Sequence, residues 1–537
     1  MATIDAVSLH VAKRGIAANE NRAGLRLTAV LTVLALFIHG YHPYSEDGGV
    51  YLPGIEKILH PELFPSWSEF VTAHERWSLF APSLALLVRL THVDLMVCVL
   101  AIHVLAIWAT LFAAWKLSVL CELGQEACAG AATVLALTLT IPVAGTSLIL
   151  IDPYLTARSI STPCSLFALV GALGVRRSLR EAGRVDLRSV SLLVGALLAA
   201  MIVHPLMGGY AIGCVFFLAC SWFEGSKRRM ISTVCVWCFS VCFSGLLYAM
   251  TPSQPVAYWW VAHTRTYWFL SEWHWYEWVG LVGPLAVLTL LWGRGRLGAN
   301  ETTKLLAQAS LAAGSCGVAV ALLFARDQSA NDFVASLQPL RIYLAIYLLM
   351  LIAIGAALGQ MVLQRHTWRW VLLVLSLGGG MASVQRATYR ASAHLELPWS
   401  QPANQWEKGF LWVRNNTPQN ALIALDANYI TASDEDGQNF RAIAERSALP
   451  DYSKDGGTAA IAPDLADQWR EGQRLQFHLN EEIGAGQTTM LDAEDVNWVV
   501  VSKGAATNLR CPYVNEGVKV CRVGDVGDPT RNEERIR

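Results

Sequence analysis

Residues 94–117 read DLMVCVLAIHVLAIWATLFAAWKL, and only Asp94 at the start and Lys116 near the end of this stretch are charged. A helix that crosses the hydrocarbon core of a bilayer needs about 20 predominantly apolar residues. The stretch is therefore long enough and apolar enough to be a membrane helix. Similar runs recur over the first 384 residues, which indicates an integral membrane protein of many spans.

About eleven such runs can be placed along the chain. They are 24–40, 94–117, 127–150, 159–175, 189–203, 208–222, 231–250, 279–292, 304–325, 341–362 and 368–384. The fifth and sixth are separated by His204-Pro205, and proline ends or kinks a helix. The first run follows a basic leader, but no small-residue cleavage site with a soluble protein behind it follows, so we interpret it as a membrane helix.

The charged residues divide the chain into two parts. Residues 1–384 hold 45 of the 83 charged side chains, whereas the much shorter segment 385–537 holds 38. The density in the second segment, about a quarter, is typical of a soluble domain. We therefore expect a tail at 1–23, a membrane domain at 24–384 with a long loop at 41–93, and a soluble domain at 385–537. The net charge of −1 gives no indication of a nucleic-acid partner.

The C-terminal segment alternates the two kinds of secondary-structure signal. Residues 421–425 form a short apolar run, and residues 498–501 and 517–523 are rich in β-branched residues; all three are predicted to be strands. Residues 438–445 and 463–475 are predicted to be helices. The whole chain should therefore be mainly α: a polytopic helical bundle followed by a small α/β domain.

Positive charge in short loops predicts the orientation of the bundle, because cytoplasmic loops carry an excess of Lys and Arg. Four loops are rich in these residues, and all fall on the same side as the basic N-terminal tail; they lie at 176–188, 227–229, 294–304 and 365–369. The N-terminus is then cytoplasmic. The loop 41–93, with one or two interfacial helices, and the C-terminal domain would lie on the outer side of a bacterial inner (plasma) membrane.

Two of the twelve cysteines lie in the soluble segment. Cys511 and Cys521 flank the sequence PYVNEG, which resembles a hairpin turn. On an oxidising side of the membrane the two could form a disulfide. The alternative is a pair of free thiols in a β-hairpin.

An acidic motif directly follows the first predicted membrane helix. Glu46 and Asp47 precede two glycines, in the sequence HPYSEDGGVY from residue 42 to residue 51. Such a pair of carboxylates can serve as a general base or hold a divalent cation. The alternative is a solvated Asp-Gly turn.

Two further polar clusters are predicted on the same outer side. Asp152 and Arg158 lie between the third and fourth membrane runs, where Arg158 could bind a phosphate through two hydrogen bonds. The alternative is an internal ion pair that joins Asp152 to Arg158. His204 lies at the outer turn between the fifth and sixth runs, where it could instead be an interfacial residue at a helix break.

The segment 258–278 is the fourth cluster, with His263, Arg265 and Trp268 among many aromatic residues. Tryptophan at a membrane interface usually forms an aromatic belt, but here it could also stack on a sugar or a polyprenyl chain. Arg341 opens the tenth run at the same depth, where it could hold a lipid phosphate or anchor its helix. Ionisable groups at the membrane are costly and are functional candidates by default, so their convergence on one face predicts a membrane-embedded active site.

The acidic motif, the topology and the C-terminal domain together resemble the GT-C superfamily, the membrane glycosyltransferases that use polyprenyl-phosphate sugars. Protein mannosyltransferases and the aminoarabinose transferase of lipid A are members. Glu46-Asp47 matches the acidic motif that follows helix one in that superfamily, and Asp152 matches a second acidic position in a later external loop. The tail segments Trp406–Asp426 and Phe440–Asp455 resemble those of a distant bacterial branch of this superfamily. The chain departs from mannosyltransferases in having Glu-Asp-Gly-Gly where they have an Asp-Glu pair.

The resemblance implies a role for each predicted residue. Asp47 would be the general base, and Glu46 would position it or bind a cation. The remaining predicted residues would bind substrate: Asp152 and His204 would orient the acceptor or a metal, the cations Arg158, Arg265 and Arg341 would neutralise the leaving polyprenyl phosphate, and His263 and Trp268 would contact the substrates. A divalent cation could be held by Glu46, Asp47 and Asp152. The implied partners are the bilayer, a lipid-linked sugar donor and a glycan, lipid or protein acceptor.

The alternative from another functional class is a non-catalytic membrane protein, either a transporter or a scaffold for the C-terminal domain. A transporter more often has broken helices and charges near mid-membrane, with inverted repeats. A scaffold would carry its important surface in the C-terminal domain, and its loop carboxylates would be dispensable.

Overall fold

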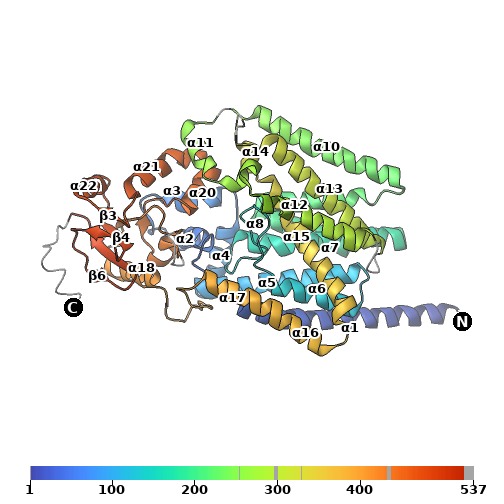
Figure 1. Ribbon diagram of the computed structural model, residues 1–537. Helices are drawn as coiled ribbons and strands as arrows, with labels where there is room; N and C mark the ends of the chain where they lie inside the picture. The colour runs from blue at the N-terminus through green and yellow to red at the C-terminus, as the bar shows by residue number, and fades with distance from the viewer. Residues whose placement is uncertain are drawn as a thin grey trace.

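The apolar runs form an elongated bundle of helices, and a smaller domain with a β-sheet lies at one end of it (Figure 1). The computed structural model describes residues 2–252, 254–294, 300–327, 329, 331–431 and 437–524. Helix α1 begins at the end of the bundle that is far from the sheet, and its last turns lie close to the smaller domain (Figure 1). The predicted fold class, a polytopic α-helical membrane bundle with a small α/β domain, is confirmed.

Eight helices or helical stretches among the described residues are long and apolar enough to cross a membrane. Six of them are single helices or a helix with its short extension: Asn21–His39 of α1 (Ala2–His39), α5 (Leu95–Leu120), α7 (Ala157–Ala182), α10 (Ser226–Met250), α12 with η4 (Trp275–Gly293) and α13 (Glu301–Phe324). The seventh is the stretch Phe333–Leu363, made of α14, η5 (Pro339–Ile342), α15 (Tyr343–Leu358) and η6. The eighth is the stretch Thr367–Thr388, made of α16, η7 and α17 (Gly379–Thr388). Each coincides with one of the predicted runs.

The other three predicted runs contain shorter helices. These are α6 (Gln125–Leu137), α8 (Leu187–Val203) and α9 (Pro205–Cys220). The run 127–150 is helical only as far as Leu137, and the chain from 138 to 151 is irregular and largely buried. Pro142 cannot donate a helical hydrogen bond, and apolar composition alone does not distinguish a helix from a buried loop. Irregular backbone at membrane depth is tolerated where protein covers it or where it lines a cavity.

Helices α6 and α15 approach each other closely through glycine. A Cβ atom on Gly130 of α6 would lie 2.2 Å from the carbonyl oxygen of Gly355, and one on Gly355 would lie 2.4 Å from the carbonyl oxygen of Gly130. Small residues at such a contact let the two backbones meet, which is the usual basis of helix association in membranes. Helices α7 and α8 also pack side by side, and α5 packs on α7.

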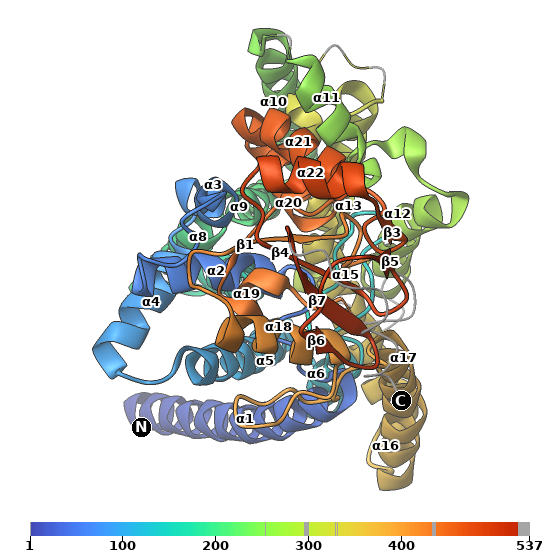
Figure 2. The ribbon, with the colours of Figure 1, turned by 90° about the vertical axis from the view of Figure 1, so that its left-hand side faces the viewer.

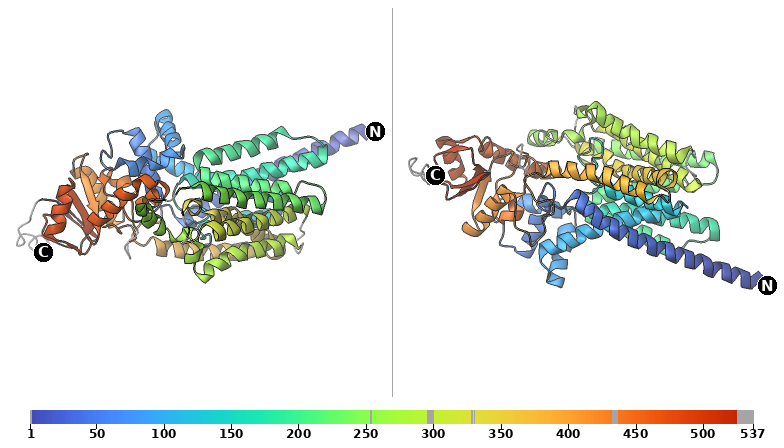
Figure 3. Two further views of the ribbon diagram at one scale, coloured as in Figure 1. Left: turned by 90° about the horizontal axis from the view of Figure 1, so that it is seen from above. Right: turned by 60° about the horizontal axis from the view of Figure 1, so that its bottom comes forward.

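The loop 41–93 is itself helical. It forms α2 (Gly48–Leu59), α3 (Ser68–Thr72), η1 (Ala73–Arg76) and α4 (Phe80–Thr91). These helices lie between the bundle and the sheet domain (Figures 1 and 3). The helices predicted within this loop are therefore present, with α2 and α4 the longest among them.

The smaller domain, called here the C-terminal domain (405–524), is built on a five-stranded sheet of order β2-β1-β4-β7-β6 (Figure 2). Strand β1 (Leu422–Leu425) runs parallel to β2 (Ser447–Ala448) and β4 (Trp498–Ser502), whereas β7 (Val518–Arg522) runs antiparallel to β4 and β6 (Tyr513–Val514). A second sheet pairs β3 (Glu482–Ile483) with β5 (Ala506–Thr507). The helices are α18 (Gln405–Asn416), α19 (Phe440–Ala444), α20 (Lys454–Ile461), η8 (Pro463–Leu465), α21 (Ala466–Gln476) and α22 (Ala485–Ala493). The three predicted strands correspond to β1, β4 and β7.

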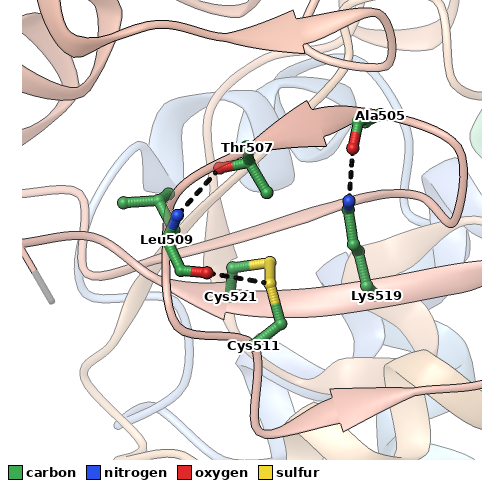
Figure 4. Close-up of a disulfide and its surroundings, with 6 residues drawn as sticks. All are labelled: Ala505, Thr507, Leu509, Cys511, Lys519 and Cys521. Carbon is green, nitrogen blue, oxygen red and sulfur yellow. Dashed lines mark hydrogen bonds between the residues drawn. A yellow bond between two sulfur atoms is a disulfide. The ribbon is translucent and has the colours of Figure 1, made fainter. Parts of the chain in front are cut away.

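A disulfide joins Cys511 to Cys521 of strand β7, as the sequence predicted (Figure 4). The Lys519 ammonium donates to the Ala505 carbonyl close by. The bond ties the segment before β6 to the last described strand of the sheet.

Polar contacts dock the C-terminal domain on the loops at the near end of the bundle. The Asn439 backbone N–H donates to the Tyr44 carbonyl oxygen at 2.9 Å, and the Tyr258 hydroxyl donates to the Ala460 carbonyl oxygen at 3.0 Å. A Cβ atom on Gly49 would lie only 1.9 Å from the Cβ of Asn439. The second glycine of the acidic motif is therefore required by the close approach of the C-terminal domain.

Candidate functional site

A cavity of about 1400 Å³ opens where the bundle, the loop helices and the C-terminal domain meet. One part of its wall is charged and comes from the outer ends of the helices and from α20. Another part is apolar and comes from membrane helices; it includes Phe217, Phe239, Phe243, Leu247, Val320 and Ile342. The irregular segment after α6 also contributes to the wall. The cavity thus joins a polar chamber at one end of the bundle to an apolar surface between helices.

Eight of the nine residues predicted to bind substrate or catalyse line this cavity. They are Glu46, Asp47, Asp152, Arg158, His204, Arg265, Trp268 and Arg341. His263 is not among the lining residues: its Nδ1 lies 2.9 Å from Asp327 and its ring stacks on Trp259 and Phe269. We therefore interpret His263 as a residue that stabilises the segment after α11 (Val256–His263) and not as a ligand of substrate.

Asp47 is the centre of the charged wall. The Nη2 of Arg158 lies 2.7 Å from the Asp152 carboxylate and 3.5 Å from the Asp47 carboxylate. On its other side, the Asp47 carboxylate accepts a hydrogen bond from the Lys454 ammonium at 3.2 Å, and Lys454 also pairs with Glu46. The internal ion pair between Asp152 and Arg158 is therefore present, but it belongs to a larger network that includes the acidic motif.

Lys454 is a member of this network that the sequence reasoning missed. It is the first residue of helix α20 and comes from the C-terminal domain. Ser453, Gly457 and Thr458 of the same segment also line the cavity. No spacing rule connects residue 454 with residue 46, because only the folding of the C-terminal domain onto the loops brings them together.

Arg265 lines the cavity, but its guanidinium is already engaged. Its Nη1 donates to the Ser453 carbonyl at 2.7 Å, and its Nη2 donates to the Tyr452 carbonyl at 3.0 Å. Arg265 therefore fixes the backbone that carries Lys454. The role predicted for it, direct neutralisation of a phosphate, fits these contacts less well than a positioning role.

Arg341 lines the cavity without a comparable partner. Its Nε–H donates to no partner among the described residues, and no ion pair joins it to a described carboxylate. It lies in η5, at the start of α15, and is one of four Lys or Arg residues among the described lining residues. This guanidinium is consequently available to an anion that enters the cavity.

Two histidines also line the cavity, His204 as predicted and His74 in addition. His74 lies in η1 of the outer loop, and its ring meets that of Tyr51 edge-on. Burial lowers the pKa of His74, in spite of the carboxylates of Asp47 and Asp455. The Nδ1 of His74 has no hydrogen-bond partner among the described residues. A neutral imidazole therefore faces this chamber.

The charges of the network shift the pKa values of Asp47, Asp152 and Lys454. Burial by itself would raise the pKa of Asp47, but Lys454 and Arg158 outweigh it and hold that pKa well below its usual range. Burial and the Asp47 carboxylate raise the pKa of Asp152 in spite of Arg158. The two carboxylates hold the pKa of Lys454 above its usual range, although burial opposes them. In this arrangement Asp47 is a carboxylate with low basicity.

The carboxylates do not form a metal site in this arrangement. No group of three His, Cys, Asp or Glu side chains that could surround a metal occurs in the part of the chain that the structure describes. Glu46 and Asp47 instead pair with Lys454, and Asp47 and Asp152 pair with Arg158. The residues present therefore do not fit the predicted divalent cation.

Two solved structures share the general arrangement of this chain. An oligosaccharyltransferase of Archaeoglobus fulgidus in its apo form matches with a TM-score of 0.48 and 10% identity, over 89% of this chain and 69% of that one. The arabinofuranosyltransferase AftD from Mycobacteria matches with a TM-score of 0.47 and 13% identity, over 94% of this chain and 42% of that one. No family profile and no curated protein matches the sequence.

Both neighbours are glycosyl-transferring enzymes by name. This chain spans less than half the length of the arabinofuranosyltransferase. Likeness at these TM-scores carries no argument about substrates, so the chemistry of the cavity must supply it.

Proposed function

We propose that the protein is a membrane glycosyltransferase that moves a sugar from a polyprenyl-phosphate carrier to an acceptor on the outer face of the membrane. The observation that supports this most directly is the cavity itself. A lipid-linked sugar needs an apolar surface for its chain, cations for its phosphate and a polar chamber for its sugar. One continuous cavity offers all three.

The apolar wall suits the polyprenyl chain. Phe239, Phe243 and Leu247 lie on α10, a helix that has no buried residue. Such a loosely covered helix at the edge of the bundle lets a chain enter from the bilayer. The neighbouring charged wall would then receive the phosphate, because anionic groups in a low-dielectric site need fixed cations.

The reaction would follow from these positions. The acceptor oxygen attacks the anomeric carbon, the bond from that carbon to the phosphate oxygen breaks, and its electron pair leaves with the polyprenyl phosphate. The acceptor proton passes to Asp47, and Arg158 and Arg341 stabilise the charge that develops on the phosphate. Glu46, Asp152 and His204 would orient the acceptor or these charged groups.

Envelope analysis of a strain that lacks the gene tests the proposal. The strain is complemented with wild type, Asp47→Asn or Arg341→Gln, and its lipids and glycans are compared by mass spectrometry. We expect one sugar modification to disappear and a polyprenyl-phosphate sugar to accumulate, with reversal by wild type alone. Equal behaviour of all three complemented strains would favour the transporter or scaffold alternative.

Two features keep this experiment informative. Asp47→Asn removes an ion-pair partner of Lys454 and could loosen the docking of the C-terminal domain, so the amount of protein is measured in each strain. Arg341→Gln breaks no ion pair between described residues and should fold normally. Asp94→Asn is the matched control, because Asp94 caps α5 away from the cavity lining and asparagine caps equally well.

A further inference from the structure

We propose that Lys454 is a ligand of the donor phosphate, and that donor binding moves its ammonium from the Glu46–Asp47 pair to that phosphate. The C-terminal domain would then be part of the active site and not an accessory to it. This inference rests on the proposed function. The movement of Lys454, a residue of the C-terminal domain, is then the step that makes Asp47 able to act as a base.

The backbone that carries Lys454 is held firmly. Arg265 binds the carbonyls of the two preceding residues. The Lys454 amide donates to the Asp451 carboxylate at 2.6 Å, and the Trp469 indole donates to the Asp451 carbonyl at 3.0 Å. Arg441 in turn holds Asp455 at 2.8 Å. The main chain is thus fixed, while the flexible four-carbon stem of a lysine lets its ammonium change partners.

The lysine side chain lies at the boundary of the cavity and is 13% exposed. Among the described residues its ammonium has two anionic partners, Glu46 and Asp47, and both of them also line the cavity. An entering phosphate would bring further anionic acceptor oxygens to the same ammonium. A lysine behaves as a mobile point charge toward phosphate, which suits this exchange.

The charge balance of the wall favours the exchange. The described lining residues include four cations, Arg158, Arg265, Arg341 and Lys454, and three carboxylates. The wall therefore has one positive charge in excess, which matches the single negative charge of a phosphodiester-linked sugar. When the sugar leaves, the phosphate monoester gains a second negative charge, and a cation already placed on it stabilises that change.

The exchange also explains how Asp47 could accept a proton. As long as Lys454 donates to it, the pKa of Asp47 lies too low for an effective base. Movement of the ammonium onto the phosphate removes the nearer of the two cations that face Asp47. The carboxylate then takes the proton of the acceptor hydroxyl as the oxygen attacks the anomeric carbon. Proton transfer is thereby confined to the donor-bound enzyme.

Binding of a long-chain polyprenyl monophosphate to the purified full-length protein tests the inference. The matching polyprenol, which lacks the phosphate, measures the contribution of the apolar wall. Lys454→Met should weaken binding of the phosphate about tenfold, the loss expected for one charge-assisted hydrogen bond, and leave binding of the polyprenol unchanged. The control is Lys503→Met, at an exposed position in the C-terminal domain.

Glu46→Gln distinguishes a phosphate ligand from a merely structural lysine. Removal of a carboxylate that competes for the ammonium should tighten phosphate binding about three- to fivefold, and this gain should vanish in the double variant with Lys454→Met. A lysine that only docks the C-terminal domain predicts that any gain in Glu46→Gln persists in the double variant, because the gain then comes from the lost carboxylate charge alone. Glu46→Gln itself should keep its fold, because Asp47 still holds Lys454.

The outcomes separate this inference from the function on which it rests. Wild type that binds the phosphate no better than the polyprenol would contradict the proposed donor. Wild type that prefers the phosphate, with equal affinity in Lys454→Met or with a gain in Glu46→Gln that persists in the double variant, would overturn the role of Lys454 alone. A loss in Lys454→Met together with a gain in Glu46→Gln that vanishes in the double variant supports both.

Discussion

Replacement of Asp152 by asparagine separates the structural from the functional part of the charged network. Asp152 is 4% exposed and Arg158 is 5% exposed, and the two are 2.7 Å apart. Asp152→Asn keeps the size of the side chain but leaves Arg158 without its nearest carboxylate. A buried ion pair that loses one partner destabilises a protein, because the remaining charge has left water without compensation.

The size of the effect follows from the remaining contacts of Arg158. Loss of one partner of a buried pair typically costs about 3–5 kcal/mol. The Asp47 carboxylate, 3.5 Å from Arg158, still compensates part of the charge. We therefore expect Asp152→Asn to lower the free energy of unfolding by about 3 kcal/mol, the low end of that range. The double variant Asp152→Asn with Arg158→Gln should regain most of this loss, since neither charge is then buried alone.

Thermal unfolding in detergent and sugar transfer are measured on the same preparations. The single variant should unfold at a lower temperature, and the double variant should unfold close to wild type. Sugar transfer should be absent in the double variant, because no Arg158 guanidinium then faces the donor phosphate. Wild-type stability of Asp152→Asn would refute the reasoning about burial, and restored transfer in the double variant would refute the role of Arg158.

Four further predictions follow from single contacts. Arg341→Gln should raise the KM for the donor about tenfold without lowering the melting temperature, as steady-state kinetics and unfolding would show together. Burial and the neighbouring carboxylate raise the pKa of Asp451 to about 7. Between about pH 4 and pH 7 the folded chain therefore keeps a proton on Asp451 that the unfolded chain has lost, so the free energy of unfolding should fall as the pH rises through this window. In Asp451→Asn the difference between the free energies of unfolding measured at pH 5 and at pH 8 should be smaller than in wild type by about 2–4 kcal/mol. Replacement of Cys511 and Cys521 by alanine should destabilise the C-terminal domain by about 2–3 kcal/mol, a loss that reductant should reproduce in wild type. Gly49→Val should prevent docking of the C-terminal domain and increase its sensitivity to protease, whereas Gly486→Val in α22, where a Cβ atom meets open space, should not.

The sequence by itself determined the membrane architecture. Runs of apolar residues fix which segments become helices in a bilayer, because every backbone polar group there must find a partner within the helix. The same reading located the C-terminal domain by its charge density, found β1 as a short apolar run, and found β4 and β7 by their β-branched residues. It missed the early end of α6, since apolar content is the same for a buried loop and for a helix.

The candidate site was found from the sequence only in part. Ionisable residues at helix ends are rare enough in a membrane protein to stand out, and Asp47, Asp152 and Arg158 were recognised for that reason. His263 was grouped with them because it shares their depth, although its partner Asp327 lies elsewhere in the chain. Sequence position gives the depth of a residue in the membrane but not the direction in which its side chain points.

Only the tertiary structure decided which charges face one another. Lys454 is one of many charged residues in a soluble domain, and nothing in its local sequence distinguishes it. The domain packs on the outer loops through Gly49 and Asn439, and this contact brings the lysine to the acidic motif. Electrostatic coupling depends on distance through space, so the low basicity of Asp47 and the partners of Arg265 are properties of the folded chain alone.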